Sequence, residues 1–390
     1  MVSTGRGEPP DNPRGGVENE AYLLVNSLAK NVKSIHYVEK LSKTTLPENV
    51  FVHNPFSGQP CFGDTFLGGL LYSPILAFRV ANMAKQILAK YSVQLIHFHE
   101  TRGNLPVHFL FGSKDMPTVL SIHGPVPWTV KYDSKIETFV RIYSYRFFDV
   151  HAFKRVDHLI AVSHWLKRKL MTLGLPDNRI SVIYNPIDTS VFSPERNSEK
   201  MSKSILDELD LDTASYFFTV GSLVSRKRHI DLIRAFASYK GDKKLVIVGN
   251  GPGFPNVNRL IYRYGLNHRI KILRRVESPC LPYLYANAHA FVTCSLAEGL
   301  PVSIMEAMSS GLGIISPNTP WIEELVGPDN GVLFSPFDDK AITDALTFFD
   351  DNSSKLLGMR SRRIAETSFS LQTCATSTSS VYESLLEQRD

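Results

Sequence analysis

Residues 295–311 read SLAEGLPVSIMEAMSSG, and this stretch decides the fold. The apolar run HAFVTC at 289–294 precedes it and is typical of a buried strand. Pro301 stands where the first turn of a helix would begin, and Gly311 is a residue type that commonly follows a helix end. A buried strand, a short loop and a helix in this order indicate an α/β fold.

The start of the expected helix has the properties of an anion-binding site. The first N–H groups of a helix have no partner inside it, and the helix dipole is positive at this end. Pro301 carries no N–H, so the donors here would be the amides of Leu300, Val302 and Ser303. We expect the diphosphate of a sugar nucleotide to bind against these groups.

Two carboxylates flank this helix start. Glu298 lies in the loop and is expected to contact the transferred sugar, whereas Glu306 lies one turn inside the helix and would reach the ribose hydroxyls. The alternative is coincidence, because a chain with 38 acidic residues contains two glutamates at this spacing about once by chance. The rest of the chain decides between these interpretations.

Length and composition indicate two globular domains. The chain has 390 residues, too many for one ordinary core, and 43% of them are hydrophobic and 21% charged. Its 4 cysteines form no CxxC pair, which argues against a zinc site or a disulfide framework and suits a reducing cytoplasm. The opening residues are polar and rich in glycine and proline, so we expect no signal peptide.

The sequence contains no segment expected to cross a membrane. The best candidate, FLGGLLYSPILAF at 66–78, is too short and is interrupted by glycine and proline, so it is either a buried helix start or a segment that dips into a bilayer surface. Residues 1–195 hold 21 basic and 16 acidic side chains, whereas residues 196–390 are balanced. This excess suits an anionic acceptor or membrane face and is too small for nucleic-acid binding.

Two loops of the first half are candidate ligand contacts. Gly15 and Gly16 precede a helix expected at 17–30, and paired glycines let a ligand approach the backbone, although a plain turn has the same pattern. His123 follows the strand expected at 118–122, where open α/β sheets bind ligands. A lone histidine is usually structural, but one at a strand end before glycine is a better functional candidate.

Residues 193–215 are polar and charged and predict a linker into a second domain. Within them, Asp210-Leu-Asp212 imitates the metal-binding DxD found in some sugar transferases, but no strand precedes it and we attribute it to chance. Helices are expected at 321–326 and at 371–386, and the second is long enough to cross back onto the first domain.

The second half begins with a strand expected at 216–220 and a loop that contains Lys227. An ammonium in a strand-to-helix loop can neutralise a diphosphate as a point charge. A glycine turn follows the strand expected at 245–248, but Phe254 stands where a dinucleotide fingerprint needs its third glycine.

Together these elements resemble the family-4 glycosyltransferases, which have the two-lobed GT-B architecture. The resemblance covers nearly the whole chain and rests on the order and spacing of its motifs. They are Gly15-Gly16, His123-Gly124, DHLIAVSHWLKRKL and ISVIYNPIDTSVF within 157–192, VGSLVSRKRHIDLIRAF at 220–236, LVIVGNGP at 245–252, SLAEGLPVSIMEAM at 295–308 and FSL at 369–371. The implied fold is α/β, with two Rossmann-like domains facing across a cleft: residues 1–190 plus a C-terminal helix at 371–390 on the acceptor side, and residues 191–370 for the nucleotide sugar.

The resemblance implies a retaining enzyme that moves a sugar from a UDP- or GDP-sugar to a glycan or lipid-linked acceptor, without metal or cofactor. Glu298 and His123 would be catalytic, Glu306 would hold the ribose, and Lys227 would stabilise the leaving diphosphate. The remaining donor-binding positions would be Gly221, Ser222, Gly249, Gly251, Arg275, Val276, Gly299, Leu300, Val302 and Ser303, with Gly15 and Gly16 as an acceptor or phosphate loop. A cytoplasmic protein is expected, with peripheral membrane contact through its basic N-terminal domain and no nucleic-acid partner.

One departure from the family pattern concerns phosphate binding. Family members often have arginine directly after the glycine of the first strand in the second domain, where this chain has Ser222. Arg226 and Arg228 in the same loop are the alternatives for this charge. Because of this departure, a second interpretation stays open, in which the chain is a catalytically weak sugar-nucleotide-binding protein or a partner subunit. A third interpretation, a nucleotide-sugar epimerase of similar fold, does not account for the helix flanked by two glutamates.

Overall fold

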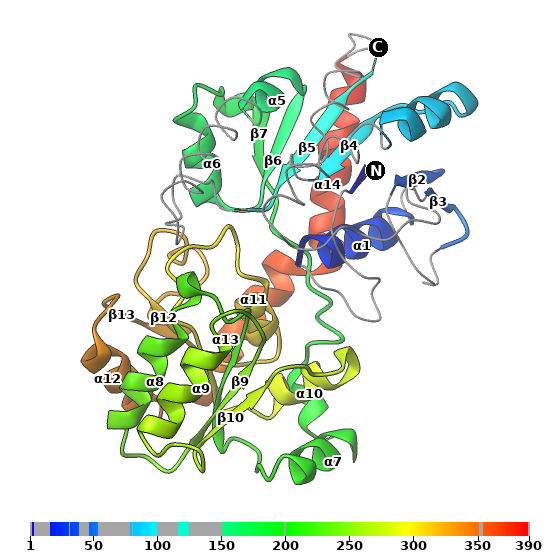
Figure 1. Cartoon of the computed structure of the whole chain (residues 1–390). Coiled ribbons are helices and arrows are strands. Elements are labelled where there is room, and N and C mark those ends of the chain that lie inside the picture. Colours follow the sequence, from blue (N-terminus) through cyan, green and yellow to red (C-terminus); the bar gives the residue numbers. More distant parts are fainter. Residues whose placement is uncertain are drawn as a thin grey trace. The chain divides into compact units, whose positions relative to one another are not determined.

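The computed structural model describes residues 2–3, 16–30, 32–38, 47–53, 79, 81–99, 116–124, 150–198, 200–350 and 354–388. Within the chain, two compact units are present. The first comprises Met1–Pro186 with Leu371–Asp390, and the second comprises Ile187–Ser370. Figure 1 shows the helices and strands of each unit along the chain.

The first unit is built on a parallel sheet of 7 strands in the order β3-β2-β1-β4-β5-β6-β7. The short strand at Val2–Ser3 pairs with both of its neighbours, β2 and β4. The central strands are buried along their whole length, as parallel strands covered on both faces should be. The strands are β1 (Val2–Ser3), β2 (Ile35–Val38), β3 (Val50–His53), β4 (Ile96–His99), β5 (Thr118–Ile122), β6 (His158–Ala161) and β7 (Ile180–Val182).

Helices cover this sheet, and the last of them comes from the end of the chain. The helix α14 (Leu371–Glu387) packs beside α1 (Gly16–Leu28), as Figure 1 shows for the red and blue helices. Ala375 of α14 joins an apolar cluster with Leu24 and Val25, and Cys374 joins another with Val119 and Ile160. The first unit also contains helical residues 81–90, α5 (Val150–Arg155), α6 (His164–Met171) and the 3-10 turn Asp177–Arg179.

The second unit contains a parallel sheet of 6 strands in the order β10-β9-β8-β11-β12-β13. Its strands carry apolar side chains on both faces. Phe217 belongs to a core with the helices on one face, whereas Phe218 meets Tyr285 on the other, with ring centroids 4.9 Å apart. The strands are β8 (Tyr216–Val220), β9 (Lys244–Val248), β10 (Ile270–Leu273), β11 (Ala290–Val292), β12 (Ile314–Pro317) and β13 (Gly331–Phe334).

The helices α8, α9 and α12 pack together on one face of the second sheet, and α10, α11 and α13 pack together on the other. Their bounds are α8 (His229–Ser238), α9 (Phe254–Arg263), α10 (Leu281–Ala286), α11 (Val302–Ser309), α12 (Asp339–Asp350) and α13 (Ser354–Ile364), with 3-10 turns at Ser225–Lys227 and Ser278–Cys280 and a π-helical segment at Ala365–Phe369.

Two expectations about the second half were wrong. Residues 193–215 are not a linker, because they contain the 3-10 helix Pro194–Ser198 and α7 (Lys200–Glu208), whose Ile205 and Leu206 are buried. Residues 321–326 form turns instead of a helix. Trp321 is buried there and its Nε1–H donates to the carbonyl of Leu296, 3.2 Å away, so a tertiary contact fixes this segment.

Candidate functional site

The strand order of the second sheet reverses at β8. The chain moves from β8 to β9 on one side, and later returns to place β11 on the other side. In open α/β sheets, ligands bind beyond the carboxyl ends of the strands at such a reversal. The loops that follow β8 and β11, residues 221–228 and 293–301, therefore form the candidate site.

The second of these loops leads into α11, whose first turn was the expected anion site. Ile304 is the first residue of this turn to make a helical hydrogen bond, from its N–H to the carbonyl of Pro301 at 3.0 Å. The amides of Leu300, Val302 and Ser303 precede it, in the positions that helices leave without an internal partner. The helix is held to the unit by buried side chains, Ile304, Met305, Ala307 and Met308.

The two loops are joined at the Glu298 carboxylate. Lys227 Nζ lies 2.6 Å from Glu298 Oε1, and Arg226 Nη1 lies 2.9 Å from the same oxygen. The Ser295 hydroxyl also donates to this oxygen, at 2.5 Å. Arg226 donates further to the carbonyl of Ala297 at 3.0 Å, so it links the β8 loop to the β11 loop through both side chain and backbone.

Glu298 remains ionised in this arrangement. Its side chain is only 11% exposed. Burial raises the pKa of a carboxyl group, but the Lys227 ammonium and the Arg226 guanidinium more than offset burial here, and the pKa of Glu298 lies below its usual value. The site therefore holds a fixed negative charge between two cations.

Glu306 has a different environment. The Tyr285 hydroxyl lies 2.8 Å from Glu306 Oε2 and 3.2 Å from the carbonyl of Ser303. Burial and then the nearby Glu306 carboxylate raise the pKa of Tyr285 well above its usual value, so this hydroxyl stays a donor. Glu306 is only half-buried, which leaves it accessible to neutral hydroxyl groups beside the helix start.

The expected glycines of the loops have a steric role within this unit. A Cβ on Gly249 would overlap the carbonyl of Gly221, and one on Gly251 would lie 2.7 Å from the carbonyl of Leu223. A Cβ on Gly221 would lie 3.4 Å from Lys227 Cε, an ordinary van der Waals distance, so the lysine side chain does not require a glycine there. The β8 and β9 loops can pack together in this way only because Gly249 and Gly251 lack side chains.

The structure separates the two arginines that could supply the charge missing at Ser222. Arg228 forms a two-pronged ion pair with the buried Asp231, with Nε 2.6 Å from Oδ2 and Nη2 2.9 Å from Oδ1. Its guanidinium also lies over the Phe337 ring, 5.0 Å from the centroid. Arg226 is thus the arginine that lies beside Lys227 and Glu298, while Ser222 is exposed.

The loop with two of the expected donor-binding positions, Arg275 and Val276, follows β10. Arg275 is exposed and Val276 is half-buried, at the carboxyl edge of the sheet and two strands from β8. The neighbouring Arg274 lies over the Phe254 ring, 4.5 Å from the centroid, and donates to Asn250 Oδ1 at 3.2 Å. These contacts link the β10 loop to the β9 loop.

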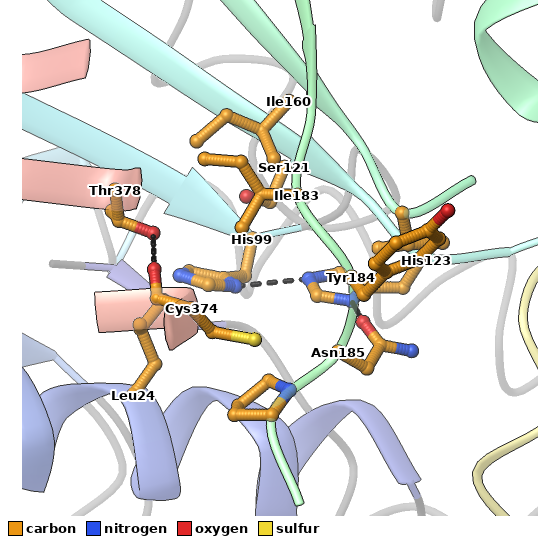
Figure 2. A pocket seen from close by; sticks show the side chains of 12 residues that line it. Leu24, His99, Ser121, His123, Ile160, Ile183, Tyr184, Asn185, Cys374 and Thr378 are labelled. Carbon is orange, nitrogen blue, oxygen red and sulfur yellow. Dashed lines mark hydrogen bonds between the residues drawn. The ribbon is translucent and has the colours of Figure 1, made fainter. Parts of the chain in front are cut away.

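In the first unit, His123 lines a pocket between β5, the end of β7 and α14 (Figure 2). His123 Nδ1 lies 3.0 Å from Asn185 Oδ1, and His123 Nε2 lies 3.0 Å from His99 Nδ1. Since the amide oxygen only accepts, Nδ1 of His123 carries the proton and Nε2 accepts from His99. Gly16 begins α1 of the same unit, and Gly15 lies outside the described residues.

A second histidine of β4 extends this network. His97 lies 2.8 Å from the Ser121 hydroxyl through Nε2 and also contacts the Tyr382 hydroxyl of α14. Its ring stacks on His99, with centroids 4.4 Å apart. Burial, together with the neighbouring imidazoles, lowers the pKa of both His97 and His99 well below the usual value, so they are neutral at pH 7.

Comparison with known proteins identifies the family. Residues 14–191 match the family model described as Glycosyltransferase Family 4, and residues 202–366 match the model described as Glycosyl transferases group 1. The chain belongs to the family-4 glycosyltransferases. The first matched region covers residues 14–186 of the first unit and extends to residue 191, while the second lies within the second unit.

Several named relatives belong to the same group. The O-antigen chain mannosyltransferase RfbU of Salmonella typhimurium is 26% identical over 54% of this chain and 56% of its own length. The lipopolysaccharide 1,6-galactosyltransferase of the same organism is 28% identical over 46% of this chain and 48% of its own length. This chain thus spans about half the length of these relatives.

Solved structures have the same fold along the whole chain. The sucrose-phosphate synthase of Thermosynechococcus elongatus matches with a TM-score of 0.83 and 18% identity, over 99% of this chain and 98% of that chain. Anabaena HepE, solved with UDP, matches with a TM-score of 0.71 and 19% identity, over 98% of both chains. Each unit thus has the Rossmann-like α/β architecture expected for a family-4 glycosyltransferase.

The structure brings the predicted Lys227 and Glu298 together and adds residues that sequence reasoning did not assign to the site. Arg226 was only one of two alternatives, and Ser295 and Tyr285 were not considered. His97 and His99 were also missed, although residues two apart on a strand share one face and could have indicated a cluster. Tyr285 carries no such signal, because its contact with Glu306 joins two different helices.

Two features are absent from the described residues. No group of three or more His, Cys, Asp or Glu side chains there is placed to hold a metal ion. Asp210 of the DxD pattern pairs with Lys244 Nζ at 3.0 Å instead. In the same part of the chain, no helix has the length and apolar character that a bilayer crossing needs.

Proposed function

We propose that this chain transfers a sugar from a UDP- or GDP-sugar to a glycan or lipid-linked acceptor, with retention of anomeric configuration and without a metal or cofactor. The observation that carries the proposal is the meeting of Lys227, Arg226 and the start of α11 at the strand-order reversal. Three sources of positive potential lie there beside one carboxylate. The structures of Anabaena HepE with UDP and with UDP-glucose support a nucleotide sugar as the ligand.

The chemistry follows from where negative charge develops. When the bond between the sugar's anomeric carbon and the diphosphate breaks, its electron pair stays on the diphosphate oxygen. Lys227, Arg226 and the amides of Val302 and Ser303 are preorganised donors for that charge. Glu298 would contact the transferred sugar, and Glu306, held by Tyr285, would bind the ribose.

His123 and the Gly15-Gly16 pair of the first unit are also proposed to contact the ligands. The His123 ring is held by Asn185 and His99, which fixes the proton on Nδ1. Gly16, at the start of α1, would allow a ligand to approach the backbone. These roles are proposals about the assembled enzyme.

The acceptor and the location are also proposals. The relatives include proteins named for O-antigen, lipopolysaccharide, teichuronic acid and phosphatidylinositol, which supports a glycan or lipid-linked acceptor. The excess of basic residues in the first half suits peripheral contact with an anionic membrane face in the cytoplasm. No nucleic acid is proposed as a partner.

The proposal is tested by mixing the protein with UDP- and GDP-sugars, with and without a metal chelator, and measuring released nucleoside diphosphate. A thermal-shift screen of the same ligands identifies the base, because a ligand of the native state raises the melting temperature. Release that survives chelation supports the proposal. Binding without release, in the presence of a range of glycan and lipid-linked acceptors, would favour the alternative of a weakly catalytic binding protein or partner subunit.

A further inference from the structure

Glu298 Oε1 has an unusual concentration of donors. Lys227 Nζ, Arg226 Nη1 and the Ser295 hydroxyl all lie between 2.5 and 2.9 Å from this one oxygen. The Lys227 side chain is 15% exposed and that of Glu298 is 11% exposed, so both charges are largely removed from water. Such charges are retained only where they have partners, because a lone buried ion loses several kcal/mol of hydration.

The same two cations are the groups to which a diphosphate would bind. They lie in the loop after β8, at the strand-order reversal and next to the start of α11. Two positive charges and one negative charge leave the cluster with a net positive charge, which attracts a phosphate group. Glu298 weakens this attraction, because its negative charge offsets part of the positive potential of Lys227 and Arg226 and occupies their N–H groups.

We propose that Glu298 is an internal counter-ion that competes with a nucleoside diphosphate for Arg226 and Lys227. The inference rests on the proposed function for the location of the diphosphate. It adds a property that the contacts of Glu298 with a sugar would not produce: the carboxylate weakens binding of the diphosphate itself.

A nucleotide sugar and a nucleoside diphosphate then bind with different consequences. When a nucleotide sugar draws the cations toward its diphosphate, the hydroxyls of its sugar can donate to Glu298 and replace the lost partners. A nucleoside diphosphate has no such hydroxyls at that point, so Glu298 loses partners without compensation. After transfer, Glu298 therefore recaptures Lys227 and Arg226 and promotes release of the product.

The experiment measures binding of UDP, GDP and inorganic pyrophosphate by calorimetry, to the full chain and to Glu298→Gln. The amide keeps the size of the side chain and removes its charge. We expect the nucleoside diphosphate that binds, and pyrophosphate, to bind Glu298→Gln about threefold to tenfold more tightly, which is the scale of a partly screened charge pair. The matching nucleotide sugar should gain nothing or bind more weakly. Equal or weaker binding of the diphosphates to Glu298→Gln would overturn the inference.

Two further variants keep the test decisive. Glu323→Gln removes an exposed carboxylate elsewhere in the unit and should leave all affinities unchanged. Arg226→Gln removes one of the two cations from a side chain that is 35% exposed, so it should fold and bind the diphosphates more weakly. If Glu298→Gln does not fold, unchanged diphosphate affinity in Arg226→Gln overturns the inference.

The pyrophosphate measurement separates the inference from the proposed function. Tighter pyrophosphate binding by Glu298→Gln, with no binding of any nucleotide, would support the counter-ion and contradict the transferase proposal. Nucleotide-sugar turnover that falls in Glu298→Gln, with diphosphate affinity unchanged, would support the transferase and contradict the counter-ion.

Discussion

The hydroxyl of Tyr285 in α10 lies 2.8 Å from Glu306 Oε2 in α11, and so holds in place the carboxylate proposed to bind the ribose. The tyrosine ring is fully buried and packs against both Phe218 and Phe291 of the sheet. The position of Glu306 is thus set by the core of the unit as well as by its own helix. A carboxylate held in this way loses less conformational freedom when a ligand binds.

Tyr285→Phe tests this coupling. We expect the free energy of unfolding to fall by about 1–2 kcal/mol, because a buried hydrogen bond to a carboxylate is lost. Affinity for the nucleotide sugar should fall about twofold to tenfold, since Glu306 must then be ordered on binding. Calorimetry and urea unfolding measure the two effects.

The control is Tyr216→Phe. Tyr216 is equally buried and its hydroxyl donates to the carbonyl of Leu284 at 2.7 Å, without contact to Glu306. It should lose similar stability and keep its affinity. Equal affinity losses in the two variants would mean that Tyr285 acts only through stability.

Removal of the charged groups themselves should separate binding from turnover. Lys227→Ala and Glu306→Ala should each weaken nucleotide-sugar binding by about tenfold or more, because each removes a direct charge-assisted contact. Glu298→Ala should mainly lower turnover, because its carboxylate is proposed to contact the reacting sugar. Lys240→Ala, which removes an exposed ammonium from the same unit, is the matched control. Unchanged donor affinity in both of the first two variants would contradict the proposed site.

The elements that sequence reasoning predicted well share one property: a local run of apolar residues indicates that they are buried. The run TVLSI at Thr118–Ile122 is rich in apolar and β-branched residues, and it forms a fully buried strand. The helix predicted at 321–326 was wrong because a pattern of six residues does not distinguish a helix from successive turns. The buried Trp321 and its hydrogen bond to the carbonyl of Leu296 favour the turns. The linker predicted at 193–215 was wrong because the two buried residues of α7, Ile205 and Leu206, stand between polar and charged residues and give no apolar run.

The site was predictable to the extent that its residues belong to motifs. Glu298, Glu306 and Lys227 were located because strand-loop-helix units place them at one edge of a sheet. The choice of Arg226 over Arg228 needed coordinates, because it depends on Asp231 being close enough to engage the second arginine. The partners of His123 come from β4 and from the loop after β7. Their spacing in the sequence does not show that they lie within hydrogen-bond distance of His123.

At Arg228, the strain of a left-handed backbone can be compared with the stabilisation from the ion pair that its side chain forms with Asp231. Its φ is +54°, in the left-handed region that costs a non-glycine residue about 1 kcal/mol, yet its fork with Asp231 compensates. Arg228→Ala should lower the free energy of unfolding by about 2–4 kcal/mol, since Asp231 is 4% exposed and loses its main partner.

Arg228→Gly separates the two contributions. It loses the same ion pair but relieves the backbone, so it should be more stable than Arg228→Ala by about 1 kcal/mol. Urea unfolding of the two variants gives the difference directly. An alanine variant as stable as the glycine variant would mean that the left-handed conformation carries no strain here.

The pH dependence of stability should include a contribution from His229. Burial, and then the charge of Lys227, lower the pKa of this histidine to about 4, and it is only 6% exposed at the start of α8. The unfolded chain takes up a proton near pH 6.5, whereas the folded unit does not until about pH 4. Because the unfolded state then binds more protons, stability falls as the pH decreases from 6.5 toward 4 and does not change above this window.

The expected slope from this one group is about 1.4 kcal/mol per pH unit between pH 6 and 5, above the range in which most carboxylates titrate. Thermal unfolding of the full chain at closely spaced pH values measures it. His229→Gln should reduce the fall in melting temperature over this range, while His268→Gln, at an exposed position, should leave it unchanged. A fall of the same size in His229→Gln would show that His229 is protonated equally in the folded and unfolded chain, so that burial does not lower its pKa.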